Sequence, residues 1–160
     1  MKREKLSEEK IKRRVEELLS EYMYTEPALE MKRYIQHGRT TTYDHAMSVA
    51  YESYRIAYNL SLKLDYKKLV VCAFLHDFYL YDWHIRDESH RLHGFSHAEK
   101  AAENATRIYG IDEKARKIIS SHMWPLNLAK IPTSPEAWVL TLADKAVSLR
   151  ESVKGFFQKL

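Results

Sequence analysis

The 160-residue chain has one cysteine, four glycines and four prolines, and it has no long hydrophobic run. A disulfide needs two cysteines, so the single Cys72 excludes an internal disulfide framework and favours the reducing cytosol. The longest apolar run, Leu69 to Leu75, is far shorter than a membrane-spanning helix, and no apolar signal-peptide core follows the basic start. We therefore expect a cytoplasmic protein with no membrane partner.

Two motifs of nucleotide and acyl chemistry are absent as well. There is no glycine-rich phosphate loop, and no serine lies on a recognisable nucleophile elbow. The net charge is +4, but the basic residues between positions 2 and 14 are interleaved with glutamates. This mixture is typical of a solvated helix face, so a nucleic-acid polymer is not indicated as a partner.

Helical periodicity runs through almost the whole chain. An apolar stripe between residues 11 and 22, opened by Ser7, predicts an N-terminal amphipathic helix. Gly38 is placed to stop a second helix, and Ser96 with Glu99 has the form of a capping box that opens a later one. The further segments predicted to be helical are 27–37, 40–60, 65–77, 96–109, 112–122 and 134–147.

No segment has the alternating pattern of a strand, and residues 78–95 are aromatic, polar and aperiodic, which predicts an ordered loop. A chain of 160 residues with 45% hydrophobic residues is long enough for one domain with a sizeable core and short for two. The sequence therefore predicts an all-α fold, a single-domain helical bundle of about six to seven helices.

An ionisable pair, His76 and Asp77, closes the most apolar helix of the chain. Buried charge must be paired or must coordinate a metal, so this pair requires compensation. Further imidazole and carboxylate groups are expected on other helices or helix ends, at His45, His97, His122 and Asp144. Together the six side chains offer a complete ligand set for one or two transition metals.

Each of these residues also has an ordinary structural interpretation when it is taken alone. A single histidine near apolar residues is more often hydrogen-bonded than a ligand. Asp144 could be satisfied by a salt bridge to Lys145 or to a neighbouring helix. The combination, at positions that would otherwise be core, is what favours a metal centre.

Four of these residues form a pattern: a histidine, then a His-Asp pair some thirty residues later, then a distant aspartate on the last helix. The pattern is found in Tyr43-Asp-His45-Ala, Phe74-Leu-His76-Asp77 and Leu142-Ala-Asp144-Lys. This three-part pattern resembles the HD-domain superfamily of metal-dependent phosphohydrolases, and the resemblance spans roughly residues 38 to 150. The resemblance implies an HD domain over residues 26–160. Residues 1–25 would then be an N-terminal amphipathic helix appended to it.

Two further histidines, His97 and His122, resemble the extra histidines of dinuclear members such as bacterial diadenosine tetraphosphate hydrolases. By that resemblance the residues of the three-part pattern would hold one metal and Asp77 would bridge to a second. The two extra histidines would complete the ligand set of that second metal. The segment 78–84 departs from the commoner dinuclear pattern, because the usual Ile-Gly and lysine are absent. The resemblance therefore leaves the substrate undefined.

The implied cofactors are one or two divalent metal ions, with Fe, Mn, Co, Ni or Zn suited to mixed His/Asp ligation. The implied activity is hydrolysis of a small phosphorylated, nucleotide-like substrate by a metal-activated water, with Asp77 in the catalytic centre. Lys145, next to Asp144, and Arg39, before the His45 helix, are candidates for binding phosphate, although either could be an ordinary surface charge.

Other chemistry could come from the aromatic loop and its surroundings. His93 is a candidate general acid, because an imidazole titrates near neutral pH. Trp83 and Trp124 are candidates for stacking on a base. Two rival functions remain open on the same ligand set: a diiron oxygenase, which the superfamily also contains, and a non-catalytic module that senses a nucleotide or a metal. The sequence does not indicate the oligomeric state.

Overall fold

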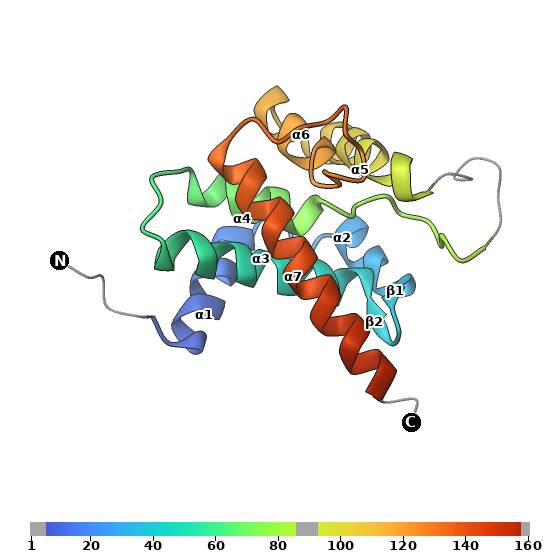
Figure 1. Cartoon of the computed structure of the whole chain (residues 1–160), viewed down its shortest axis with the longest axis horizontal. Coiled ribbons are helices and arrows are strands. Elements are labelled where there is room, and N and C mark those ends of the chain that lie inside the picture. Colours follow the sequence, from blue (N-terminus) through green and yellow to red (C-terminus); the bar gives the residue numbers. More distant parts are fainter. Residues whose placement is uncertain (1–5, 86–92, 158–160) are drawn as a thin grey trace.

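The computed structural model describes residues 6–85 and 93–157, except for the side chains of residues 37, 93 and 95 (Figure 1). Helices dominate these residues, as the sequence predicts, and one small hairpin accompanies them. The elements, in chain order, are α1 (Glu8–Leu19), α2 (Glu26–Glu30), the 3₁₀ helix η1 (Met31–Arg33), β1 (Ile35–His37), β2 (Thr40–Thr41), α3 (Thr42–Asn59), α4 (Tyr66–Leu75), α5 (His93–Tyr109), α6 (Glu113–Ser120) and α7 (Pro135–Phe157).

Side-chain caps begin several of these helices at the residues the sequence indicates. The side chains of Ser7, Asp65 and Asp112 accept hydrogen bonds of 3.3, 2.9 and 2.8 Å from backbone N–H groups in the first turns of α1, α4 and α6. Gly110 follows α5 with a φ of +63°, the left-handed conformation that often ends a helix. These local signals therefore fix where the helices begin and end.

The core lies around α3 and α4. From Leu69 to Leu75, helix α4 is apolar on all sides and buried, and α3 packs along it. Helix α1 covers this pair with Ile11, Val15 and Leu19, and the long helix α7 crosses α3 and α4 (Figure 1). Helices α5 and α6 pack on each other and on α4. The end of α4 is thereby enclosed by α3, α5, α6 and α7.

The helix predicted at 27–37 is wrong, and so is the expectation that no strands form. Helix α2 ends at Glu30, and the chain then turns through η1 into an antiparallel pair that places Ile35 opposite Thr41. Gly38 lies in the connecting turn with a φ of +59° instead of ending a helix. The β-branched residues that flank this turn favour extended backbone, and the hairpin brings the side chain of Gln36 to the interior.

The start predicted for α5 at the Ser96 capping box is also wrong, because the helix begins at His93. Glu99 does not cap the helix. Its carboxylate instead forms ion pairs with Arg116 of α6 and with Lys130, the latter at 3.3 Å. Tertiary charge pairing has therefore replaced the local cap.

Among the described residues, none of the helices combines the length and the low polarity needed to cross a lipid bilayer.

Candidate metal centre

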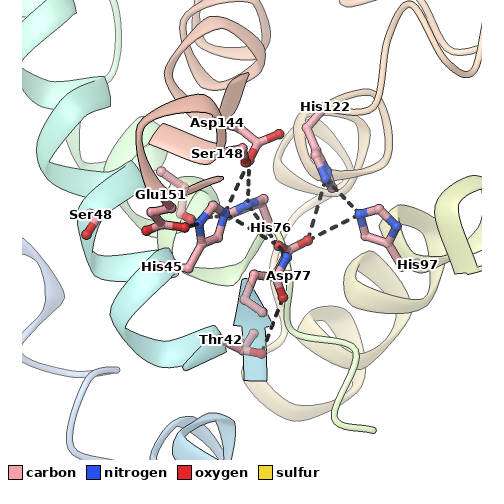
Figure 2. A network of polar contacts seen from close by, with 12 residues as sticks. Thr42, His45, Ser48, His76, Asp77, His97, His122, Asp144, Ser148 and Glu151 are labelled. Carbon is pink, nitrogen blue, oxygen red and sulfur yellow. Dashed lines mark hydrogen bonds and ion pairs between the residues drawn. The ribbon is translucent and has the colours of Figure 1, made fainter. Parts of the chain in front are cut away.

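The six predicted ligand side chains meet at one buried place (Figure 2). His45 lies near the start of α3, His76 and Asp77 follow α4 directly, and His97 lies near the start of α5. His122 follows α6, and Asp144 lies within α7. Each of the six is at most 8% exposed. Residues that are far apart in the sequence thus converge where the apolar helix α4 ends.

One half of the cluster is formed around Asp144. Its Oδ1 lies 3.2 Å from Nε2 of His45 and 3.6 Å from Nε2 of His76. The same two nitrogens lie 3.7 and 3.3 Å from Oδ2 of Asp77. Two imidazoles and two carboxylates therefore face one point.

The other half lies on the opposite side of Asp77, between α5 and α6 (Figure 2). Oδ1 of Asp77 is 3.2 Å from Nε2 of His97 and 3.6 Å from Nε2 of His122. The two imidazole nitrogens are 3.2 Å apart. Each oxygen of Asp77 thus serves a different group of histidines, which is the arrangement of a bridging carboxylate.

The donor atoms fit a metal on this structure's own evidence. Three overlapping groups of three side chains each have ligand atoms within 4.8 Å of one another. Within the described part of the chain, Nε2 of His76 and Oδ1 of Asp77 are buried without a hydrogen-bond partner. Buried polar atoms without such a partner are rare and often mark an ion. Imidazole and carboxylate donors suit divalent transition metals.

Hydrogen bonds to backbone carbonyls orient two of the imidazoles. Nδ1 of His76 donates to the carbonyl of Ala73 at 2.6 Å, and Nδ1 of His122 donates to the carbonyl of Ile119 at 2.7 Å. Each acceptor lies three residues earlier, at a helix end where carbonyls lack helical partners. These hydrogen bonds leave Nε2 of each ring facing the cluster, the nitrogen that would carry the lone pair of a metal ligand.

The charges in the cluster stabilise one another. Burial favours the neutral carboxyl, but His76 and its neighbours outweigh burial and hold the pKa of Asp77 well below its usual value. The pKa of Asp144 is also held low, since the histidines outweigh its burial. Burial, together with repulsion from His76 and His97, lowers the pKa of His122 to about 3. The structure therefore offers ionised carboxylates and, at His122, a neutral imidazole.

Several residues that sequence reasoning missed surround these ligands. Gln36 donates from Nε2 to Oδ2 of Asp77 at 2.6 Å, and Ser148 donates to Oδ1 of Asp144 at 3.2 Å. Oε2 of Glu151 lies 2.8 Å from Nδ1 of His45. Ser148 and Glu151 lie one and two helical turns beyond Asp144, so helical spacing could have found them. Gln36 gave no such signal, because its segment was predicted to be helical.

A cleft of about 760 Å³ opens onto the cluster. Its walls include four of the ligand residues, together with Lys145 and Trp83. Nζ of Lys145 donates to the carbonyl of His122 at 3.1 Å, and burial lowers the pKa of this ammonium group. The cleft can therefore admit a small molecule to the metal ligands, with a cation and an aromatic ring in its walls.

The structure does not bring Arg39 or Trp124 into this cleft. Arg39 is exposed beside the turn of the hairpin, because the segment before it forms a strand rather than a helix. The ring of Trp124 packs edge-on against Trp138 of α7, with centroids 5.1 Å apart, while its neighbours Met123 and Pro125 line the cleft. The side chain of His93 lies outside the described residues, although its backbone begins α5.

An all-α fold that closes over a buried cluster of four histidines and two aspartates defines a helical domain whose interior fits a metal site. The chain belongs to the HD domain family, whose model matches residues 42–148. Members of this family are generally metal-dependent phosphohydrolases that bind divalent metals. Comparisons with curated proteins and with solved structures gave no significant match.

Proposed function

We propose that the protein is a metal-dependent phosphohydrolase of a small phosphorylated, nucleotide-like substrate. The observation that carries the proposal is Asp77, whose two carboxylate oxygens face different pairs of histidines, with a cleft beside them. His45, His76 and Asp144 would hold one metal ion, and His97 and His122 would hold the other. Asp77 would contact both ions. Fe, Mn, Co, Ni and Zn suit these ligands. Two ions bound there would activate a water and neutralise a phosphoryl oxygen.

The chain's own residues would bind and orient the substrate. Lys145 lines the same cleft as the ligands, and an ammonium group there would hold the charged phosphoryl oxygens. Trp83 supplies a flat apolar surface in the cleft wall on which a base could stack. His93 directly precedes Gly94, which lines the cleft, so we propose its imidazole as the proton donor to the leaving group.

The experiment that tests this function is a hydrolysis screen. Untagged protein loaded with Mn²⁺ or Fe²⁺ would be incubated with a panel of nucleotides, dinucleoside polyphosphates and simple phosphate esters, with release of inorganic phosphate or nucleotide as the readout. His76→Ala and Asp77→Ala should abolish any activity found. Glu103→Gln, on the exposed face of α5, should leave it unchanged. A metal-loaded protein that hydrolyses no member of the panel would refute the proposal.

The same six ligands could serve a diiron oxygenase. The lysine in the cleft favours hydrolysis, since a cation beside the ligands suits a phosphorylated substrate. Substrate-dependent oxygen consumption by the iron-loaded protein would support the oxygenase. Turnover with Mn²⁺ in the absence of oxygen would support the hydrolase. Tight nucleotide binding without turnover in either assay would identify a sensing module.

A further inference from the structure

His45 is held differently from two of the other histidines of the cluster, His76 and His122. His76 and His122 donate from Nδ1 to backbone carbonyls of their own helix ends. His45 instead meets a carboxylate, with Nδ1 2.8 Å from Oε2 of Glu151, 106 positions away in the chain. The imidazole is completely buried, and only 14% of the Glu151 side chain is exposed. This contact is therefore a buried hydrogen bond between an imidazole and a carboxylate.

Helix α7 contacts this imidazole on both edges (Figure 2). Asp144 lies 3.2 Å from Nε2, and Glu151, two turns further along the same helix, lies 2.8 Å from Nδ1. Glu151 cannot reach the face of His45 that a metal would use, because Nδ1 and Nε2 lie on different sides of the ring. The position of Glu151 fits a hydrogen-bond partner of His45 rather than a metal ligand.

Glu151 also lies beyond the part of the chain that the family shares. The family model ends at residue 148, whereas the metal ligands all fall inside the matched range. The contact thus lies outside the matched region, on the part of α7 that continues to Phe157.

We infer that Glu151 is the positioning residue of His45 and sets the metal affinity of the half-site formed with His76 and Asp144. The inference rests on the proposed metal-dependent function. A carboxylate that accepts the Nδ1 proton fixes the tautomer, leaves the lone pair on Nε2 and makes that nitrogen a stronger donor. It also holds α7 against α3, so that Asp144 and His45 stay on the same metal. Loss of such a partner typically costs about tenfold to a hundredfold in metal affinity.

The test is a Co²⁺ titration of the metal-free full-length protein, monitored by calorimetry and by the visible ligand-field spectrum. Glu151→Ala should weaken one class of Co²⁺ site by about tenfold to a hundredfold and change its spectrum, while the other class is retained. Glu151→Gln keeps an acceptor oxygen without the charge, so its affinity should lie between those of Glu151→Ala and the wild type. The matched control is Glu103→Gln, an exposed glutamate of α5 that should bind Co²⁺ like the wild type.

A double-mutant cycle separates positioning from a general loss of structure. If Glu151 acts through His45, then Glu151→Ala should cause no further loss of Co²⁺ affinity in a His45→Ala background. Circular dichroism of the metal-free variants should show unchanged helix content. The inference is overturned if Glu151→Ala binds Co²⁺ like the wild type, or if its effect is as large without His45 as with it.

These outcomes differ from a failure of the proposed function. Metal affinity is read without any substrate, so a negative hydrolysis screen would refute the phosphohydrolase and leave the role of Glu151 standing. Unchanged Co²⁺ binding in Glu151→Ala, with hydrolysis intact in the wild type, would refute only the positioning role.

Discussion

The side-chain amide of Gln36 lies 2.6 Å from Oδ2 of Asp77, although 41 positions separate the two residues. Gln36 comes from the hairpin, outside the matched family region, and its own carbonyl oxygen accepts a hydrogen bond from the hydroxyl of Tyr79. The hydroxyl of Thr42 lies 3.4 Å from the same oxygen. The Asp77 carboxylate is thereby held by a neutral donor from β1, an element that carries none of the six cluster residues, and Thr42 and Tyr79 in turn hold that donor.

Removing the Gln36 amide should therefore destabilise the metal-free protein. Gln36→Ala leaves a buried carboxylate without its closest donor and removes the oxygen that accepts from the hydroxyl of Tyr79. A hydrogen bond to a charged group contributes about 2 kcal/mol. We expect the free energy of unfolding, measured by urea denaturation after metal removal, to fall by about this amount. Arg33→Ala, on the exposed side of η1, is the control and should change it by less than about 0.5 kcal/mol. An equal loss in both variants would contradict a specific role of Gln36.

The two halves of the cluster should lose metal separately. His97 faces Oδ1 of Asp77, on the half of the cluster formed with His122, so His97→Ala should reduce the bound metal from two ions to one per chain. Asp77→Ala should abolish both sites, because its two oxygens face both halves. Metal content after dialysis, measured by plasma mass spectrometry, provides the readout. Two ions retained in His97→Ala would show that this half is not a metal site.

The clustering of the six side chains was predictable from the sequence because they are polar residues in apolar helical surroundings. His76 and Asp77 at the end of an apolar helix and Asp144 within another require compensation wherever the helices pack. The helix starts at Asp65 and Asp112 were predictable for a different reason, because a cap depends only on a few neighbouring residues.

What the sequence did not predict depends on contacts between distant segments. The hairpin at 35–41 is stabilised by the buried contact of Gln36 with Asp77, which no local pattern reveals. The helix propensity of residues 27–37 was overridden by that contact and by the turn at Gly38. Helical spacing places Glu151 on the same face as Asp144, but its partner His45 is known only once α3 is placed beside α7. The placement of Trp124 against Trp138 likewise depends on how α7 packs.

Lys145 should affect turnover more than metal binding. Its ammonium group lines the cleft and donates a hydrogen bond to the carbonyl of His122. Lys145→Ala should lower kcat/KM for a phosphorylated substrate by about tenfold to a thousandfold, and Lys145→Arg should restore part of it because the charge remains. Metal content should stay at the wild-type value. Lys154→Ala, an exposed lysine of the same helix, is the matched control. If the alanine variant at 145 loses metal instead, then the lysine supports the cluster and does not bind phosphate.

Trp83 should determine how well the site distinguishes a nucleotide from a simple phosphate ester. Its side chain lines both the main cleft and a second cleft of about 350 Å³ that also contains Gln36 and Glu151. Stacking of a base on an aromatic ring is worth about 1–3 kcal/mol, so Trp83→Ala should lower kcat/KM for nucleotides by about tenfold to a hundredfold. The value for ribose 5-phosphate, which has no base to stack, should change little. Trp138→Ala, whose ring packs on Trp124 outside the clefts, should show no such discrimination. An equal loss for both substrates in Trp83→Ala would mean that this ring shapes the cleft without contacting a base.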